Sequence, residues 1–246
     1  MVSYVVISWQ GLEMVKRIVP LLVKSKDRQI IVVNNGSTDG TDAYLKGWEN
    51  EVTTVTLDRN YGVAYARNRG IEKTTGEWVC ILDNDICFEE AAINEMVAYM
   101  ESHTDVGLAG CRLLYPDGVV QDSCKLYPGV VQKIKNLLCR GRVRYSYPEK
   151  MDSVFEPVYV IGACQLIRKS VIDEAGLLDE NIFYGSEDCD YCLRVKAKGW
   201  KVVYLPTMSM VHDCQRKTNA HPLSRLGWKH IKGLMYLYRK HRRYID

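Results

Sequence analysis

The sequence predicts a single α/β domain in which helices cover both faces of a mostly parallel sheet. Short apolar runs alternate with helical patterns through the first half of the 246 residues, and this alternation is typical of parallel sheets. Polar residues directly follow several of the runs, at the strand ends where such sheets bind ligands. No repeat, linker or sharp change of composition divides the chain, so we expect one domain over residues 1–246.

Each strand in the first half is assigned from a short run rich in Val, Ile, Leu or Tyr. Each helix is assigned from apolar residues three and four positions apart. In order, the first half reads as strand 4–8, helix 11–24, strand 29–33, helix 41–48, strand 52–57, helix 64–74 and strand 78–82. Pro20 is expected to kink or shorten the first helix, because proline lacks the donor that a helix interior needs.

The second half is less regular, although the same signals identify its elements. It reads as helix 89–101, strand 106–114, strand 158–167, helix 187–198, strand 201–205 and a final helix at 226–244. Gly199 ends the predicted helix at 187–198, as a glycine commonly does at a helix C-terminus. Pro206 is expected to halt the last strand. Residues 115–157 are polar and rich in aromatic residues, with weak periodicity.

The composition is that of a globular protein, with 47% hydrophobic and 26% charged residues. A formal net charge of +3 gives no reason to expect a nucleic-acid partner. No apolar stretch reaches membrane-spanning length, and the first residues lack the pattern of a signal peptide. The nine cysteines are odd in number and show no framework spacing. We therefore expect a cytoplasmic, reducing environment without disulfides.

The most informative segment is Asp83-Asn84-Asp85, which closes the apolar run at 78–82. A charge at the end of a core strand is costly unless it is paired. Carboxylate oxygens suit Mg²⁺ or Mn²⁺, and these cations suit a diphosphate. The segment therefore favours a nucleotide-linked substrate, with a helix cap or a solvated loop as the alternative.

Two further groups are candidates for the same edge of the sheet. Ser8 and the pair Asn34-Asn35 follow the first and second predicted strands, with Asp39 shortly afterwards. Turn chemistry alone also explains these residues. Arg67 lies one turn into the helix that begins after Gly62. Its planar set of donors suits a phosphate or ribose, although a solvated surface arginine is the commoner case.

Three acids, Glu187, Asp188 and Asp190, begin the helix at 187–198. The helix dipole favours acids there, but adjacent carboxylates also repel, which suits one of them to accept a proton. His212 lies after the last predicted strand. Its imidazole could complete an octahedral Mn²⁺ site together with Asp85. The rival interpretation is a structural zinc site formed by Cys189, Cys192, His212 and Cys214.

The final helix is basic and amphipathic, with Lys and Arg dense between Arg225 and Arg243. Such a helix can lie on an anionic membrane surface. It can equally pack on the domain with a solvated basic face. The sequence leaves both possibilities open.

Taken in order, these segments resemble glycosyltransferase family 2, the inverting nucleotide-sugar transferases with the Rossmann-like GT-A fold, and most of all its short rhamnosyltransferase-like members. The resemblance rests on residues 5–8, 30–41, 60–70, 76–85, 162–164, 187–190 and His212. It implies a nucleotide-sugar donor half at 1–110, an acceptor half at 111–224 and the basic C-terminal helix at 225–246. It also implies sugar transfer from a nucleotide-diphosphate sugar to a hydroxyl of a glycan or lipid-linked acceptor.

The resemblance further implies a role for each matching residue. Ser8, Asn34, Asn35, Asp39, Arg67, Asp83 and Asn84 would bind the nucleotide, Asp85 and His212 would bind Mn²⁺ or Mg²⁺, and Asp188 would be the general base. Glu187 and Asp190 would bind the acceptor or support the site. Arg216 and Lys217 would lie on a lid over the diphosphate. Members commonly carry Asp where this chain has Asn34-Asn35, so UDP-, dTDP- and GDP-sugars all remain open.

Three other functions were weighed. A catalytically weak nucleotide-sugar binder would lack the base that Asp188 offers. A sugar nucleotidyltransferase would need a glycine-rich basic loop after the first strand, where this chain has Trp9-Gln10-Gly11. A dinucleotide-dependent dehydrogenase would need a Gly-x-Gly-x-x-Gly turn after a strand, and the sequence contains none.

Overall fold

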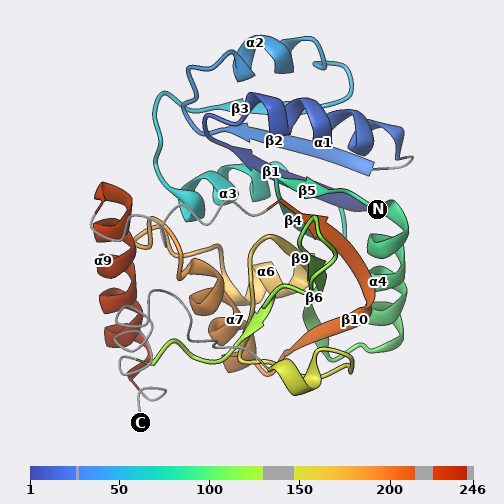
Figure 1. The fold of residues 1–246 in the computed structure, drawn as a ribbon, viewed down its shortest axis with the longest axis vertical. Coiled ribbons are helices and arrows are strands. Elements are labelled where there is room, and N and C mark those ends of the chain that lie inside the picture. The colour runs from blue at the N-terminus through green and yellow to red at the C-terminus, as the bar shows by residue number, and fades with distance from the viewer. Residues whose placement is uncertain (26–27, 130–146, 214–223, 243–246) are drawn as a thin grey trace.

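The structure is a computed structural model that describes residues 1–25, 28–129, 147–213 and 224–242 (Figure 1). Its strands are β1 (Val2–Ser8), β2 (Arg28–Asn34), β3 (Thr53–Thr56), β4 (Trp78–Asp83), β5 (Ile86–Cys87), β6 (Val106–Leu114), β7 (Cys124–Lys125), β8 (Tyr159–Val160), β9 (Cys164–Arg168) and β10 (Lys201–His212). Its helices are α1 (Leu12–Lys24), α2 (Thr41–Lys46), α3 (Val63–Ile71), α4 (Glu90–Ser102), the 3₁₀ turn η1 (Pro148–Lys150), α6 (Lys169–Ala175), α7 (Glu187–Ala197) and α9 (Arg225–Lys240).

Eight strands form one sheet in the order β3-β2-β1-β4-β9-β6-β10-β5. The strands β3, β2, β1 and β4 are parallel neighbours, as are β6 and β10. β9 runs antiparallel between β4 and β6, and β5 runs antiparallel to β10 at the edge. The strands β7 and β8 form a separate small ribbon. The predicted α/β class with a mostly parallel sheet is confirmed.

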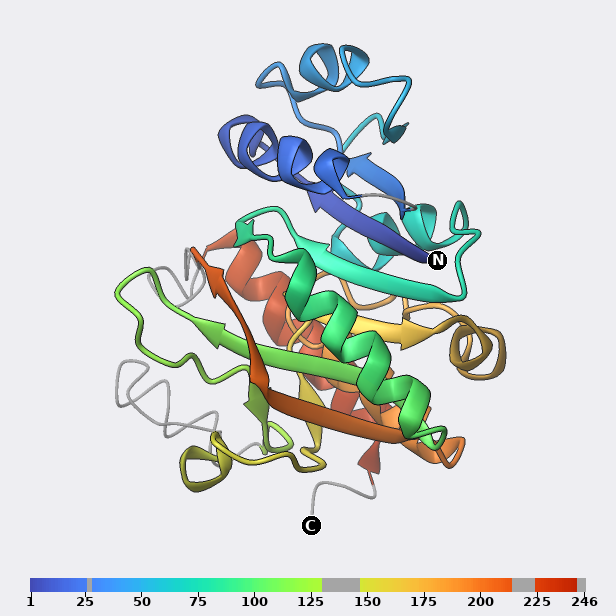
Figure 2. The same cartoon turned by 90° about the vertical axis from the view of Figure 1, so that its right-hand side faces the viewer.

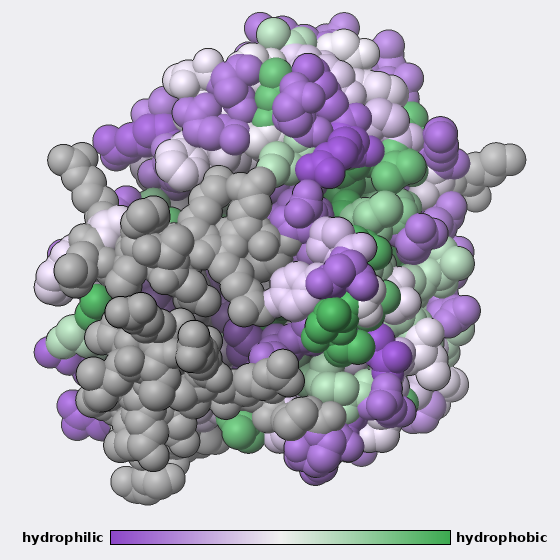
Figure 3. Space-filling view, viewed as in Figure 1, coloured by the Kyte–Doolittle hydropathy of each residue, from purple (hydrophilic) through white to green (hydrophobic). Residues whose placement is uncertain are grey.

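The helices form a layer on each face of the sheet, and each layer has its own hydrophobic core. On one face α1 and α4 bury apolar side chains that include Ile18, Leu22 and Met96, and Figure 2 shows α4 lying across this face. On the other face α3, α6 and α7 pack with buried residues such as Ile71 and Leu193. Helical spacing of apolar residues explains both layers. The surface around α2, at the top of Figure 3, is mostly hydrophilic.

The structure excludes a shortening of the first helix at Pro20 and corrects two predictions about strands. α1 continues through Pro20 to Lys24, so the proline does not shorten the helix. The predicted strand at 158–167 is two strands, β8 and β9, in different sheets. β10 continues past Pro206 to His212, and its pairing with β6 shifts register between Leu205 and Ser209. A bulge of this kind accommodates a proline because the residue there makes no regular ladder bond.

The sheet brings the predicted strand ends together at one edge. Ser8 pairs in register with Asn34, and Ile7 pairs with Asp83. The extended part of β10 returns to the same edge, where His212 pairs with Ile86. The register therefore places the ends of β1, β2, β4 and β10 next to one another, as the carboxyl ends of parallel strands require.

Two predictions based on composition can be compared with the described residues. Within them, no helix has the length and apolar character needed to cross a bilayer. The seven cysteines in the described ranges are free thiols, and all except Cys87 are buried.

Candidate active site

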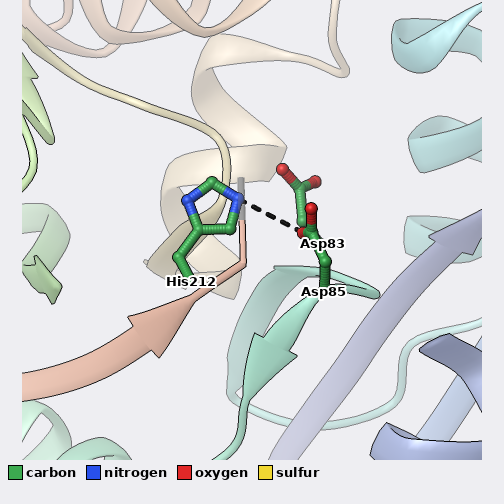
Figure 4. A group of neighbouring side chains, drawn as sticks. All are labelled: Asp83, Asp85 and His212. Carbon is green, nitrogen blue, oxygen red and sulfur yellow. Dashed lines mark ion pairs between the residues drawn. The ribbon is translucent and has the colours of Figure 1, made fainter. Parts of the chain in front are cut away.

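Asp83, Asp85 and His212 form a compact group at the carboxyl edge of the sheet (Figure 4). One ligand atom from each residue lies within 4.8 Å of the others. Asp83 ends β4, Asp85 lies in the turn to β5, and His212 ends β10. The imidazole Nε2 of His212 lies 3.2 Å from Asp85 Oδ1. Residues that are far apart in the sequence thus converge because β10 runs on to pair with β5.

The charges in this group favour a cation. Burial raises the pKa of Asp83, and neighbouring Asp85 adds to the effect while Arg67 opposes it. Burial lowers the pKa of His212, but the hydrogen bond to Asp85 and the charge of Asp83 outweigh it, so the net shift is upward. Two carboxylates facing one imidazole are a donor set that suits Mn²⁺ or Mg²⁺. The residues therefore fit a divalent cation.

Arg67 joins this group to the opposite side of the site. Its guanidinium is buried and Nη2 donates to Asp83 Oδ1 at 2.8 Å and to the Gly162 carbonyl at 2.7 Å. Nη1 lies 3.4 Å from Glu187 Oε1. Gly162 gives the guanidinium its space, because a Cβ at that position would lie 2.3 Å from Nη1. Arg67 is therefore a buried brace rather than a solvated surface residue.

Asp188 lies at the other end of this brace. Its Oδ2 accepts from the Gly162 amide at 3.3 Å, and its Oδ1 accepts from the Cys189 amide at 2.8 Å. The side chain is only partly buried, so the carboxylate keeps access to solvent. The Gly162 peptide thus contacts Asp188 through its amide and Arg67 through the carbonyl of the same residue. A continuous polar chain runs from Asp83 through Arg67 and Gly162 to Asp188.

Glu187 supports this chain from inside the protein. It is 5% exposed, and Oε2 accepts from the amides of Gly185 and Ser186 at 2.6 and 3.0 Å. Burial, and after it the charge of Asp188, raise the pKa of Glu187 to about 7, against the opposing effect of Arg67. Its carboxylate faces Arg67 and the start of α7, not an open surface. The acceptor-binding role predicted for Glu187 therefore gives way to a supporting one.

Asp190 is a second correction to the predicted acceptor site. It has no exposed surface. Oδ2 pairs with Arg194 Nε, and Oδ1 pairs with Lys240 Nζ and His241 Nε2, each at 2.8 Å. An acceptor cannot reach a fully buried carboxylate. Asp190 instead ties α7 to the C-terminal helix α9.

The remaining predicted nucleotide ligands lie at the same edge but differ in how many hydrogen bonds their side chains already make within the protein. Ser8 is buried, and its hydroxyl accepts from Asn84 Nδ2 at 3.1 Å. Asn34 Oδ1 accepts from the Ser37 amide. The side chain of Asn35 bonds Asn60, Tyr61 and Gly62, and so braces the loop before α3 rather than facing a ligand.

Asp39 is likewise engaged by the backbone. Its two oxygens accept from the amides of Leu12 and Thr41, which are the first residues of α1 and α2. These bonds lower the pKa of Asp39 against the opposing effect of burial. Asp39 thus fixes two loops at the edge of the site, and its nucleotide-binding role stays a prediction.

Sequence reasoning missed two glutamines near the site. Gln10 has a positive φ of 50°, and its backbone and side chain bond Ser37 and Thr38. Gln121 contacts the ring and the carbonyl of His212. The sequence gives no local signal for either contact, because the partners of each glutamine are distant along the chain.

The alternative zinc site is not supported by the described part of the chain. Cys189 and Cys192 are buried in the core formed by α7 and its neighbours, whereas His212 faces Asp85. Cys214 lies outside the described residues, as does most of the predicted lid, including Arg216 and Lys217. Among the described residues, Asp83, Asp85 and His212 are the one group that could hold a metal ion.

Comparison with known proteins agrees with this geometry. The sequence matches the glycosyl transferase family 2 profile over residues 3–176. An N-acetylglucosaminyl-diphospho-decaprenol L-rhamnosyltransferase of Mycobacterium tuberculosis is 26% identical over 239 residues, which cover 89% of this chain and 78% of the relative. The dTDP-rhamnosyl transferase RfbF of Shigella flexneri is 26% identical over 193 residues, which cover 77% of this chain and 61% of RfbF.

Solved structures show the same fold. Mannosyltransferase PcManGT from Pyrobaculum calidifontis, in complex with GDP-Man and Mn²⁺, matches with a TM-score of 0.66 at 17% identity, covering 98% of this chain and 64% of that one. GalNAc-T7 with UDP, GalNAc and Mn²⁺ matches with a TM-score of 0.68 at 16% identity, covering 97% and 48%. The fold is thus that of GT-A glycosyltransferases. Because the family match spans more than half of the chain, this protein belongs to glycosyltransferase family 2 and is a glycosyltransferase that uses nucleotide sugars.

Proposed function

We propose that the protein is a metal-dependent, inverting glycosyltransferase that moves a sugar from a nucleotide-diphosphate sugar to an acceptor hydroxyl. The observation that carries the proposal is the polar chain that connects the Asp83, Asp85 and His212 group to Asp188 through Arg67 and Gly162. Sugar transfer needs a site that stabilises charge and a base at the same time. Negative charge develops on the leaving diphosphate while the acceptor loses a proton.

On the donor side, Asp83, Asp85 and His212 would hold Mn²⁺ or Mg²⁺. When bound, the cation supplies charge stabilisation for the leaving diphosphate without a proton transfer. Arg67 keeps the carboxylate of Asp83 in place by a 2.8 Å bond. Ser8, Asn34 and Asn84 line the neighbouring strand ends and are the candidates for contacts to the nucleoside.

On the acceptor side, Asp188 would accept the proton of the attacking hydroxyl. Two backbone amides orient its carboxylate, and each oxygen keeps a further lone pair for the hydroxyl. Attack from the face opposite the diphosphate inverts the anomeric carbon. A positioned base contributes roughly 10²–10⁴-fold to the rate. Glu187 and Arg67 hold the start of α7 against the donor side, so they would fix the distance between the base and the leaving group.

The relatives suggest a donor and an acceptor to test first. Two of them carry the names of a dTDP-rhamnosyl transferase and of a rhamnosyltransferase acting on N-acetylglucosaminyl-diphospho-decaprenol. We therefore propose a dTDP-linked deoxyhexose as donor and a sugar on a lipid diphosphate as acceptor. UDP- and GDP-sugars are the alternatives.

A panel of dTDP-, UDP- and GDP-sugars tests this proposal. Each donor is added with Mn²⁺, with Mg²⁺ or with EDTA, and thermal stabilisation and slow donor hydrolysis are measured. We expect stabilisation and hydrolysis with one class of donor, and only when a divalent cation is present. Stabilisation without any hydrolysis would support a catalytically weak binder instead. Equal effects in EDTA would reject the metal dependence.

Helix α9 supports a second part of the proposal, contact with an anionic lipid surface. Leu234 and Leu237 are buried against the domain, whereas Trp228, Ile231 and Met235 are exposed by 56%, 38% and 54%. The exposed residues lie three, four and seven positions apart, which puts them on one helix face. Lys232 and Arg239 are exposed on α9 as well. An apolar face among cations is the pattern of helices that bind anionic membranes.

Sedimentation with lipid vesicles tests the contact. We expect the protein to bind phosphatidylglycerol vesicles and to be released by salt, and to bind phosphatidylcholine vesicles weakly. Trp228→Ser should reduce binding, whereas Val154→Ser, at a residue 46% exposed outside α9, should not. Equal binding by all three proteins would contradict the role of α9.

A further inference from the structure

We propose that Gln121 is a positioning residue for the cation site, because it fixes which ring nitrogen of His212 is free to bind a metal. This inference rests on the metal dependence proposed above. It concerns a residue that neither lies on a strand of the large sheet nor contacts the two aspartates through any described bond.

Gln121 is held close to His212 by its own backbone. Its amide donates to the Leu113 carbonyl at 2.8 Å, and its side chain is buried, with the residue 4% exposed. Oε1 lies 2.9 Å from His212 Nδ1. Nε2 donates to the His212 carbonyl at 2.7 Å and lies 3.3 Å from the Leu114 carbonyl. The side chain of Gln121 therefore bonds both the ring and the main chain of His212.

The chemistry of these partners determines the orientation of the glutamine amide. Carbonyl oxygens only accept hydrogen bonds, so the end of the amide that faces two carbonyls must be the NH₂ group. The oxygen then faces His212 Nδ1. Because a carbonyl oxygen cannot donate, Nδ1 must carry the hydrogen of this bond.

The consequence lies at the other ring nitrogen. With the hydrogen on Nδ1, the Nε2 lone pair of neutral His212 points toward Asp85, whose Oδ1 is 3.2 Å away. A lone pair facing a carboxylate is unfavourable unless a proton or a metal cation lies between them. Ligating histidines generally have their other nitrogen fixed by such an outer partner, and loss of that partner typically costs about 10–100-fold in metal affinity. Gln121 would thus prepare His212 as a ligand before any metal arrives.

Two measurements test the inference. The first is the tautomer of His212 in the metal-free protein, read from imidazole ¹⁵N shifts at a pH above the imidazole titration, with His212→Gln used to assign the signal. We expect the Nδ1–H form in the natural protein and a mixture with the Nε2–H form in Gln121→Met. The Nε2–H form in the natural protein would overturn the role of Gln121, and this result needs no variant to fold.

The second measurement is Mn²⁺ affinity, read from the free Mn²⁺ signal in electron paramagnetic resonance. We expect Gln121→Met to bind Mn²⁺ about 10–100-fold more weakly. Gln165→Met is the matched control, because Gln165 is also a buried glutamine and its side-chain Nε2 donates to the Val160 carbonyl. Its affinity should match that of the natural protein. Unchanged affinity in folded Gln121→Met would overturn the inference. Absence of Mn²⁺ binding by the natural protein would instead reject the proposed metal dependence, whichever tautomer is found.

Discussion

Asp188 and Asp190 lie two residues apart at the start of α7 but have opposite surroundings. Asp188 is partly exposed, and within the described residues its carboxylate is bonded only by backbone amides. Asp190 is fully buried and surrounded by Arg194, Lys240 and His241. With 3.6 residues per turn, a step of two residues rotates a side chain by about 200° around the helix. One acid therefore faces the site and the other faces α9, so the same helix start combines a chemical group with a structural one.

The largest expected effect on the rate of sugar transfer is at Asp188. Asp188→Asn keeps the shape and one of the two bonds from backbone amides, because only the amide oxygen of Asn can accept, and it removes the proton acceptor. We expect the rate of sugar transfer to fall by about 10²–10⁴-fold, with donor affinity and thermal stability close to normal. Steady-state rates and donor titrations measure the two effects separately. Near-normal turnover would show that Asp188 is not the base.

Asp190→Asn should give the reverse result. The substitution removes the buried negative charge to which Arg194 and Lys240 are paired. Breaking a buried ion pair in this way typically costs about 3–5 kcal/mol. We expect a large loss in the free energy of unfolding by urea denaturation, with turnover per folded molecule close to normal at low temperature. A stable variant with little activity would contradict the structural role.

Glu187, which directly precedes Asp188, predicts a pH effect on stability. Its pKa is raised from 4.5 to about 7 in the folded protein. The stabilisation that this provides is fully present below pH 4.5 and is lost as pH rises through 7. One pKa unit is worth about 1.4 kcal/mol, so the loss is roughly 3 kcal/mol.

Urea denaturation of the metal-free protein and of Glu187→Gln across pH 4.5–8 measures this effect. The free energy of unfolding of the natural protein should decline more steeply with pH, because the glutamine cannot ionise. Parallel pH profiles would show that Glu187 ionises normally in the folded state.

The smallest expected effect is at Gly162, whose peptide joins Arg67 and Asp188. In Gly162→Ala the new Cβ would meet the Arg67 guanidinium at 2.3 Å. Forced repacking of this kind costs about 1–3 kcal/mol. We expect a lower melting temperature together with a lower rate, because the brace between the two sides of the site must move. Gly199→Ala is the control for the rate. Nothing lies within 4 Å of its added Cβ, but its positive φ of 89° strains an alanine, so it should lower the melting temperature without lowering the rate.

Most of the fold followed from the sequence because its signals are local. The apolar runs and helical periods of the first half predicted the strands from β1 to β4 and the helices between them. Local signals failed where a tertiary contact overrides them. Pro206 predicts an end to β10, but a bulge against β6 lets the strand continue to His212. Gly162 lies inside a convincing apolar run, yet the chain leaves one sheet there and enters another.

The candidate site was predictable where the chemistry of a residue type decides its partners. Asp83 and Asp85 were placed together by their position at the end of one strand, whereas His212 was assigned to them from the family resemblance and from what a cation requires. Partnerships across more than a hundred residues were not visible, such as that of Arg67 with Glu187. The supporting role of Asp190 could not be chosen from the sequence for the same reason, because its partners Lys240 and His241 lie far away along the chain.

The central claim is that Asp83, Asp85 and His212 hold a cation that binds the diphosphate of the donor. Calorimetric titration of dTDP into the protein with and without Mn²⁺, compared with Asp85→Ala, tests it most directly. We expect dTDP to bind the natural protein tightly only with Mn²⁺, and Asp85→Ala to lose the Mn²⁺-dependent part of the affinity. The same Mn²⁺-dependent affinity in Asp85→Ala would contradict the claim.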